Sequence, residues 1–393
     1  MSAKNSNSTE YEVLYVDNNE KLQQLCQSIK DAPLLILDTE FVREKTYRAK
    51  LCLIQIATDD IVACIDPIAL PDITALMDII NDKNKLKILH AARQDYEIFF
   101  DLTNQLPQPL FDSQLAASLL GYGEQVGYAG LVGKILGIQL DKAHTRTDWS
   151  KRPLSEAQIR YASDDVVYLR ELYPLLQKQL IEQGRENWLN EEFDALCQPE
   201  LYITKPEDAW NKVKGINRLR PRQLAAAKNI SEWREKVAIK KDRPRRWILA
   251  DDILLAAAQL LPKNISQLES IANIKKAVID NSGETILQCV KKALSLSENE
   301  LPTTAKPKRL SADQEIIADL LLTQLKLIAN EYNISPANIA NRKTIEKLIC
   351  GDIDIALLKG WRKQLAGKKL QELLSGKSSL HIEKNKVVST QTQ

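Results

Sequence analysis

Two acidic residues at the end of an apolar run are the first candidates for chemistry in this sequence. The run begins at Leu34, and Asp38 and Glu40 close it one residue apart. Residues two apart in a β-strand point to the same face, so both carboxylates leave the strand on one side. Two negative charges held that close require a cation. An exposed strand end followed by a polar turn is the simpler interpretation, and only further acids elsewhere in the chain favour a metal site.

Two later segments supply such acids. Asp95 lies in the first turns of a predicted helix that follows a short apolar strand, with His90 at the junction between them. Asp165 lies on another predicted helix, where Tyr161 precedes it by four residues and therefore shares its face. An acid at a helix start often only compensates the helix dipole. A tyrosine at helical spacing is more often part of a core than a catalyst. Spacing alone leaves these alternatives open.

The elements that must position these residues alternate between strands and helices. Apolar runs at 51–57 and 61–65, separated by a polar turn, predict a hairpin beside the strand that carries Asp38. Apolar residues recur at helical spacing over 18–30 and 73–80. Such alternation predicts an α/β domain built around a central sheet.

Downstream of this domain the pattern becomes all helical, and the charge changes sign. Residues 1–200 carry 20 Lys and Arg against 31 Asp and Glu, a net charge of −11. Residues 201–310 carry 22 against 12, a net of +10, and residues 311–393 carry 12 against 9, a net of +3. This asymmetry suggests that metal chemistry and polyanion binding are divided between regions, with chance clustering of surface charge as the alternative. Arginines interleaved with tryptophans in the basic region suit phosphate contact and base stacking.

Composition excludes several classes of protein. A chain of 393 residues, 44% hydrophobic and 27% charged, suits two or three globular domains. It has no apolar run long enough to span a membrane and no apolar leader, so we expect a cytoplasmic protein. Six scattered cysteines without a Cys-x-x-Cys pair argue against a disulfide framework or a zinc site. The absence of a phosphate-binding loop motif argues against a helicase.

Taken together, the motifs resemble those of a known superfamily. Three segments are similar to the three motifs of the DEDD 3′-5′ exonucleases: Asp38-Thr39-Glu40-Phe41, the His-Ala-x-x-x-Asp that ends at Asp95, and Tyr161-Ala-x-x-Asp165-Val-x-Tyr168-Leu. The chain most closely resembles the ribonuclease D family. The similarity extends to Leu106-Pro-Gln-Pro109, Leu140-Asp-Lys and Arg146-Thr-Asp-Trp149, and it covers nearly the whole chain. Because Tyr161 stands four residues before Asp165, the chain falls in the tyrosine branch of the superfamily.

The resemblance implies a fold and a domain order. The expected fold is an α/β exonuclease, a ribonuclease H-like mixed sheet with flanking helices, followed by two all-α HRDC-like domains (helicase and ribonuclease D C-terminal). The expected boundaries are 1–10 disordered, 11–200 exonuclease, 207–293 first HRDC-like domain, 294–310 linker, 311–376 second HRDC-like domain, and 377–393 disordered tail.

The resemblance also implies a reaction. Two Mg²⁺ or Mn²⁺ ions, held by four acids, would drive hydrolysis of RNA 3′ ends such as those of tRNA precursors, releasing nucleoside 5′-monophosphates. The four metal ligands would be Asp38, Glu40, Asp95 and Asp165. Tyr161 would orient the attacking water, because a phenol with a pKa near 10 is a poor base at neutral pH. We expect a monomer with no membrane association.

Further residues beside the motifs are candidates for substrate contact. They are Thr39, Phe41, His90, Arg146 and Trp149. Two alternative functions remain open at this point. One is a 3′-5′ exonuclease acting on DNA, because no residue in the sequence identifies a reader of the 2′-hydroxyl. The other is a non-catalytic RNA-binding scaffold that uses only the helical regions.

Overall fold

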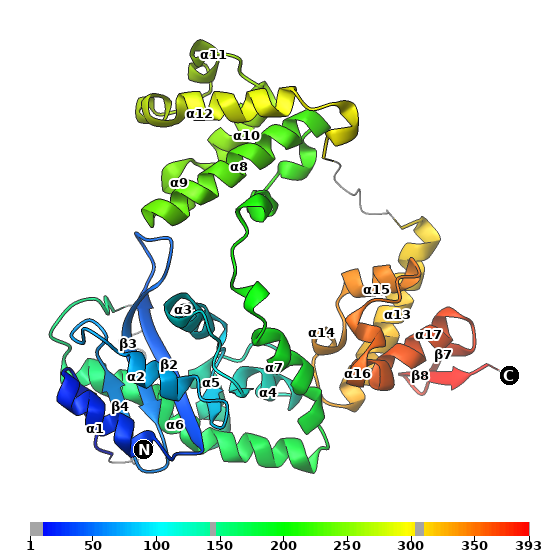
Figure 1. Ribbon diagram of the computed structural model, residues 1–393. Helices are drawn as coiled ribbons and strands as arrows, with labels where there is room; N and C mark the ends of the chain where they lie inside the picture. The colour runs from blue at the N-terminus through cyan, green and yellow to red at the C-terminus, as the bar shows by residue number, and fades with distance from the viewer. Residues whose placement is uncertain (1–10, 142–146, 303–309, 393) are drawn as a thin grey trace, which may run out of the picture.

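The chain folds into three parts that lie at the corners of a triangle (Figure 1). The computed structural model describes residues 11–141, 147–302 and 310–392. An α/β part, which carries the N-terminal segment, is followed by one helical part and then by a second. Residues 1–10, which are predicted from the sequence to be disordered, lie outside the described residues. Among the described residues, no helix is long and apolar enough to cross a membrane.

A six-stranded mixed sheet forms the centre of the α/β part, in the order β1-β4-β3-β2-β5-β6. The strands are β1 (Leu14–Val16), β2 (Leu34–Val42), β3 (Lys50–Ala57), β4 (Val62–Ile65), β5 (Leu86–Leu89) and β6 (Leu110–Asp112). β2 pairs antiparallel with β3 and parallel with β5. The predicted hairpin is confirmed, because β3 pairs antiparallel with β4.

Helices cover the sheet and complete the α/β part. They are α1 (Asn19–Ile29), α2 (Thr74–Ile80), α3 (Arg93–Thr103), α4 (Ser113–Leu119), α5 (Tyr128–Leu136), α6 (Glu156–Glu182) and α7 (Asn190–Leu196). The longest, α6, begins at a capping box in which the Ser155 hydroxyl accepts from the Gln158 N–H and the Gln158 side chain accepts from the Ser155 N–H. α6 packs across β2, β3 and β4. This packing brings the helix face with Asp165 over the strand that carries Asp38.

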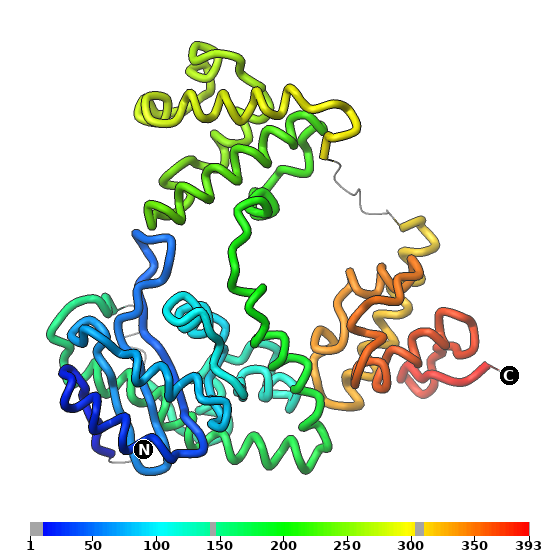
Figure 2. Tube along the Cα trace, in the orientation of Figure 1, coloured from blue at the N-terminus to red at the C-terminus, as the bar shows by residue number. Residues whose placement is uncertain are grey.

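The first helical part has its own hydrophobic core. It contains α8 (Pro221–Lys241), α9 (Arg245–Ile248), α10 (Asp251–Leu260), α11 (Ile265–Glu269) and α12 (Lys276–Leu294). The loop between β2 and β3 reaches α8, as the chain trace shows (Figure 2). There the Tyr47 hydroxyl donates to Glu235 Oε1 at 2.5 Å, and the Tyr47 and Arg48 N–H groups donate to Asp242 Oδ1 at 3.0 Å. These polar contacts join two separately folded cores.

The second helical part instead shares a hydrophobic core with the α/β part. It contains α13 (Ala312–Glu331), α14 (Pro336–Ile339), α15 (Arg342–Ile349), α16 (Gly360–Arg362) and α17 (Lys368–Leu374). Trp361 stacks on Trp188 of the α/β part, with ring centroids 4.5 Å apart and planes 4° from parallel. Arg185 donates to the Tyr332 carbonyl at 2.7 Å. This part is therefore a packed extension of the exonuclease fold.

The prediction of a disordered tail over 377–393 is wrong for most of that segment. Strands β7 (Ser378–Glu383) and β8 (Lys386–Gln391) form an antiparallel hairpin. Its two turn residues, Lys384 and Asn385, have φ of 48° and 63°, as a two-residue hairpin turn of this kind requires. Leu380 packs against the shared core. The polar composition of the segment concealed this apolar contact.

The predicted linker over 294–310 is shorter than expected. Residues Glu298–Glu300 form a short 3₁₀ turn, and Glu298 pairs with Arg222 of α8 at 2.6 Å. Leu301 packs against the core of the first helical part. The chain up to this point therefore belongs to that part, and residues 303–309 lie outside the described residues.

Candidate active site

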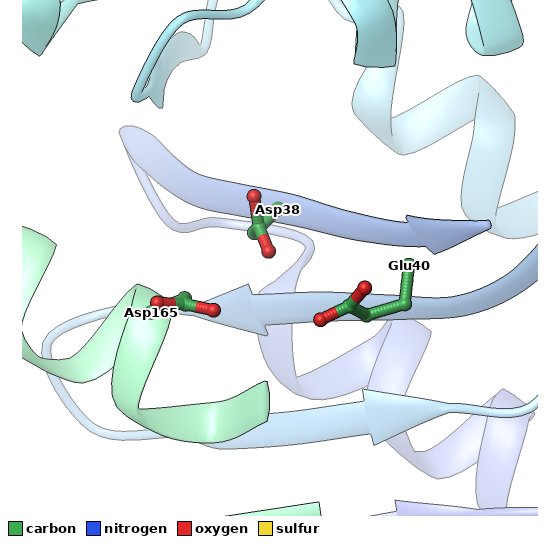
Figure 3. Close-up of side chains that lie close together, drawn as sticks. All are labelled: Asp38, Glu40 and Asp165. Atoms are coloured by element: carbon green, nitrogen blue, oxygen red, sulfur yellow. The ribbon is translucent and has the colours of Figure 1, made fainter. Parts of the chain in front are cut away.

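Three carboxylates from two elements converge at one place on the sheet. Asp38 and Glu40 extend from β2, and Asp165 extends from α6. Each offers an oxygen atom within 4.8 Å of the other two. Figure 3 shows the three groups turned toward one another, with Glu40 and Asp165 lying over the neighbouring strand β3. Strand alternation accounts for the first two acids, and the packing of α6 across the sheet accounts for the third.

Asp95, the fourth predicted acid, lies in the first turn of α3 and outside this group of three. Its side chain is buried, and the Thr39 hydroxyl donates a hydrogen bond to its Oδ1 at 2.5 Å. Thr39, a predicted substrate contact, is itself buried and holds Asp95 beside the other acids. The charge of Asp95 still raises the pKa values of Asp38 and Glu40.

The electrostatics of the cluster favour a bound cation. Burial raises the pKa of Glu40 to about 8, with smaller contributions from Asp165 and Asp95. Burial likewise raises the pKa of Asp165 to about 7 and, against the Thr39 hydrogen bond, that of Asp95 to about 7. The pKa of Asp38 is raised by burial and then by its carboxylate neighbours. Such acids keep their protons near neutral pH unless a cation replaces them. The set of hard carboxylate oxygens fits hard divalent ions.

Tyr161 lies on α6, one helical turn before Asp165. Its ring stacks on that of Trp149, with centroids 6.2 Å apart and planes 29° from parallel. Trp149 is only 3% exposed and belongs to a small hydrophobic cluster beside β3 and β4. This burial disfavours the predicted contact between Trp149 and a nucleotide, because little of the ring reaches the surface. The indole instead supports the Tyr161 ring.

Two other candidates for substrate contact also make internal contacts. Phe41 is half-buried and packs against the core of the sheet. His90 Nδ1 lies 2.9 Å from the Ser113 hydroxyl, and its ring meets that of Tyr128 edge-on. Burial lowers the pKa of His90. Contact of these residues with substrate stays a prediction, and Arg146 lies outside the described residues.

Sequence reasoning missed the residues that hold the α6 turn on which Asp165 lies. The Tyr128 hydroxyl donates to the Asp164 carbonyl at 2.9 Å, and the Tyr11 hydroxyl donates to Asp164 Oδ1 at 2.5 Å. The Arg160 guanidinium lies 3.6 Å from the centre of the Tyr11 ring. Tyr11 and Tyr128 come from distant segments, and no local spacing in the sequence links them to Asp165.

Comparison with known protein families defines the class. The family described as 3′-5′ exonuclease matches residues 13–181, and the HRDC domain family matches residues 223–290. The protein is thus a 3′-5′ exonuclease with an α/β catalytic core and a C-terminal helical HRDC domain. The HRDC match covers the first helical part, and the HRDC-like identity of 311–376 stays a prediction.

Individual relatives narrow the class further. Ribonuclease D of Bartonella henselae is 38% identical over 93% of this chain and 90% of its own length. Ribonuclease D of Zymomonas mobilis is 37% identical over 95% of this chain and 97% of its own. The crystal structure of Escherichia coli RNase D, at 30% identity, superposes with a TM-score of 0.83 over 93% of this chain and 99% of that one. The chain therefore belongs to the ribonuclease D family and is a 3′-5′ exoribonuclease.

Proposed function

We propose that this exoribonuclease hydrolyses RNA with two divalent metal ions, Mg²⁺ or Mn²⁺, held by Asp38, Glu40, Asp95 and Asp165. The observation that carries the proposal is the convergence of three of these carboxylates within 4.8 Å. Asp95, held by Thr39, is the fourth ligand of the proposed site. Their raised pKa values support it, because a half-buried group of mutually repelling acids gains most from a divalent cation.

Held by these carboxylates, the two ions would supply an activated water and would neutralise the charge that develops on the leaving oxygen. The leaving group is the 3′ oxygen of the penultimate nucleotide, so each product keeps its phosphate on the 5′ carbon. The Tyr161 hydroxyl orients the attacking water by hydrogen bonding, because a phenol is too weak a base to deprotonate it at neutral pH. Trp149 supports this role by stacking on the Tyr161 ring.

We propose structured RNA with free 3′ ends, such as tRNA precursors, as the substrate. The E. coli relative is described as an exoribonuclease involved in structured RNA processing. The first helical part supports RNA binding with a basic, aromatic surface formed by residues 243–247, here called the Trp247 surface. Trp247 is 59% exposed, and the Arg243 guanidinium lies 6.0 Å from its ring centre. An exposed tryptophan stacks on bases of any identity, and arginines bind the phosphates between them.

The Trp247 surface adjoins the exonuclease. Arg245, Arg246 and Trp247 line a groove together with Arg43 and Tyr47 from the loop that follows β2. Arg43 stands three residues after Glu40 along the chain. A single strand that lies on this surface could thus continue toward the carboxylates along β2.

We further propose the domain boundaries 11–200 for the exonuclease and 207–293 and 311–376 for two HRDC-like domains. The separate core of the first helical part supports a domain there, and it extends the end of that domain from 293 to Leu301. The helices from Ala312 to Leu374 support the third unit. We propose that the enzyme is a monomer in the cytoplasm, where precursor RNA would be available to it.

The test is digestion of one RNA labelled at either end, with and without a chelator. We expect the 3′ label to be released first as a mononucleotide and the 5′-labelled strand to shorten one nucleotide at a time, in both cases only with metal. Release that begins at the 5′ end, or that persists in chelator, would contradict the proposal. A DNA strand of the same sequence is the matched control, and faster digestion of DNA would favour the alternative function.

A further inference from the structure

Gln55 is a buried residue whose side-chain amide has no partner. It lies on β3 and is 0% exposed. Within the described part of the chain, neither its Nε2 nor its Oε1 atom makes a hydrogen bond. A buried amide without partners destabilises a fold, and nearly all buried polar groups in native proteins are paired. Apolar residues of similar volume would fill this place at less cost, so the amide calls for a functional explanation.

The position of Gln55 relates it to the carboxylates. Gln55 is the register partner of Asp38 in the pairing of β2 with β3, and of Cys64 in the pairing of β3 with β4. Residues directly opposite each other in an antiparallel pair extend from the same face of the sheet. The Gln55 side chain therefore rises between those of Asp38 and Cys64, on the face that α6 covers.

Two further observations place the acids near β3 on this face of the sheet. The thiol of Cys64, on the far side of Gln55, has its pKa raised by burial and then by the charges of Asp38 and Asp165. Figure 3 shows the carboxylates of Glu40 and Asp165 lying over β3, the strand that carries Gln55. The Gln55 side chain and the Asp38 carboxylate thus lie on the same side of the sheet.

We propose that Gln55 is a positioning residue for the metal site, and that its side-chain N–H donates a hydrogen bond to the Asp38 carboxylate when divalent metal is bound. This inference rests on the two-metal function proposed above. A metal-ligating carboxylate keeps an oxygen lone pair that can accept a hydrogen bond, and partners of this kind orient the ligand. The amide, which has no partner within the described part of the chain, is then available as a donor to the ligating Asp38 carboxylate.

The test is Gln55→Met, which keeps the volume of the side chain and removes the amide. Mn²⁺ affinity is measured by calorimetric titration of the full chain. We expect it to fall by about 10- to 100-fold, as for other residues that orient metal ligands. In chelator, we expect the melting temperature to rise, on the order of 2–4 °C, because an unpaired buried amide has been removed. A residue with a purely structural role would lower the melting temperature and leave Mn²⁺ affinity unchanged.

Gln324→Met is the matched control. Gln324 lies on α13 in the second helical part, is 3% exposed and also has a buried amide oxygen without a partner among the described residues. Its substitution should change the melting temperature without changing Mn²⁺ affinity. The comparison separates the effect of removing a buried amide from the effect of removing this particular amide.

The outcomes distinguish this inference from the function on which it rests. If the unaltered protein binds no Mn²⁺, the two-metal function is wrong, and this inference with it. If the unaltered protein binds Mn²⁺ and Gln55→Met binds it within about twofold of the same affinity, only this inference is overturned. Gln55→Leu replaces Gln55→Met if the latter does not fold. Failure of both variants to fold would also overturn the inference, because the metal-free fold would then depend on the amide.

Discussion

The carboxylate site and the Trp247 surface lie in adjoining regions of opposite charge. Residues 1–200 carry a net charge of −11, and residues 201–310 carry +10. In the first region the fold forces acids of like charge together under a helix. In the second, arginines surround an exposed tryptophan in water. Metal chemistry needs desolvated charges at close range, whereas binding a nucleic acid needs charges that counterions can reach. Turnover and RNA affinity should therefore respond to different substitutions.

The largest expected effect is at the carboxylate site. Asp165→Asn removes one metal ligand and should lower turnover by about 10³-fold or more, since a metal site contributes several kcal/mol to transition-state stabilisation. RNA affinity, measured by fluorescence anisotropy, should stay within about twofold because the Trp247 surface is intact. Glu182→Gln is the control, as Glu182 lies on the same helix but pairs with Lys178 at the surface. If Asp165→Asn digests RNA at the rate of the unaltered protein, the two-metal mechanism is contradicted.

The next largest effect should be a loss of RNA affinity without a loss of turnover. Trp247→Ala should weaken binding of single-stranded RNA by about 1–3 kcal/mol, or roughly 5- to 150-fold, because one stacking platform is lost. The single-turnover rate at saturating RNA should not change. Ile353→Ala, which removes an 80% exposed apolar side chain from the second helical part, is the control. Equal losses of RNA affinity in Trp247→Ala and Ile353→Ala would show that the Trp247 surface is not the binding site.

A moderate effect should appear in the stability of the metal-free protein as pH changes. The folded-state pKa values of Glu40, Asp95 and Asp165 are raised to about 7 or 8, above unfolded values of about 4. The folded protein then holds more protons than the unfolded one between those values, so its stability falls as pH rises from about 5 to 8. Melting curves in chelator should show this fall, and Mg²⁺ should offset it most at the upper end. A metal-free melting temperature that rises over this range would contradict the raised pKa values.

The smallest effect concerns the contact between the two regions. Tyr47→Phe removes the hydrogen bond to Glu235. The contact between the two regions should then lose about 0.5–1.5 kcal/mol of stabilising free energy. We expect binding of RNA long enough to reach both regions to weaken by about 2- to 10-fold, and binding of a dinucleotide to be unaffected. Tyr202→Phe, which loses a bond to the Leu196 carbonyl away from this contact, is the control. If Tyr47→Phe binds the long RNA as tightly as the unaltered protein does, the contact does not align the regions.

Local patterns in the chain predicted the elements well but not every boundary. Alternation and helical spacing were enough for the β3–β4 hairpin and for α1, α2, α3 and α6. The tail hairpin was missed because it packs through Leu380 against a distant core, and no pattern within 377–393 reveals that contact. For Trp149, a candidate for substrate contact, the motif indicated only its neighbours in sequence, and the burial of its ring could not be predicted because a motif does not give the direction of a side chain.

The sequence by itself determined the chemistry of this protein: the two acids on one face of a strand, the tyrosine one turn before Asp165, and the separation of acidic from basic regions. Tertiary structure alone decided which groups meet. Strand register sets Gln55 beside Asp38, and the packing of α3 against β2 lets Thr39 hold Asp95. The physical reason is that periodicity encodes the environment of each residue relative to its own element, whereas contacts between elements depend on how whole faces pack together.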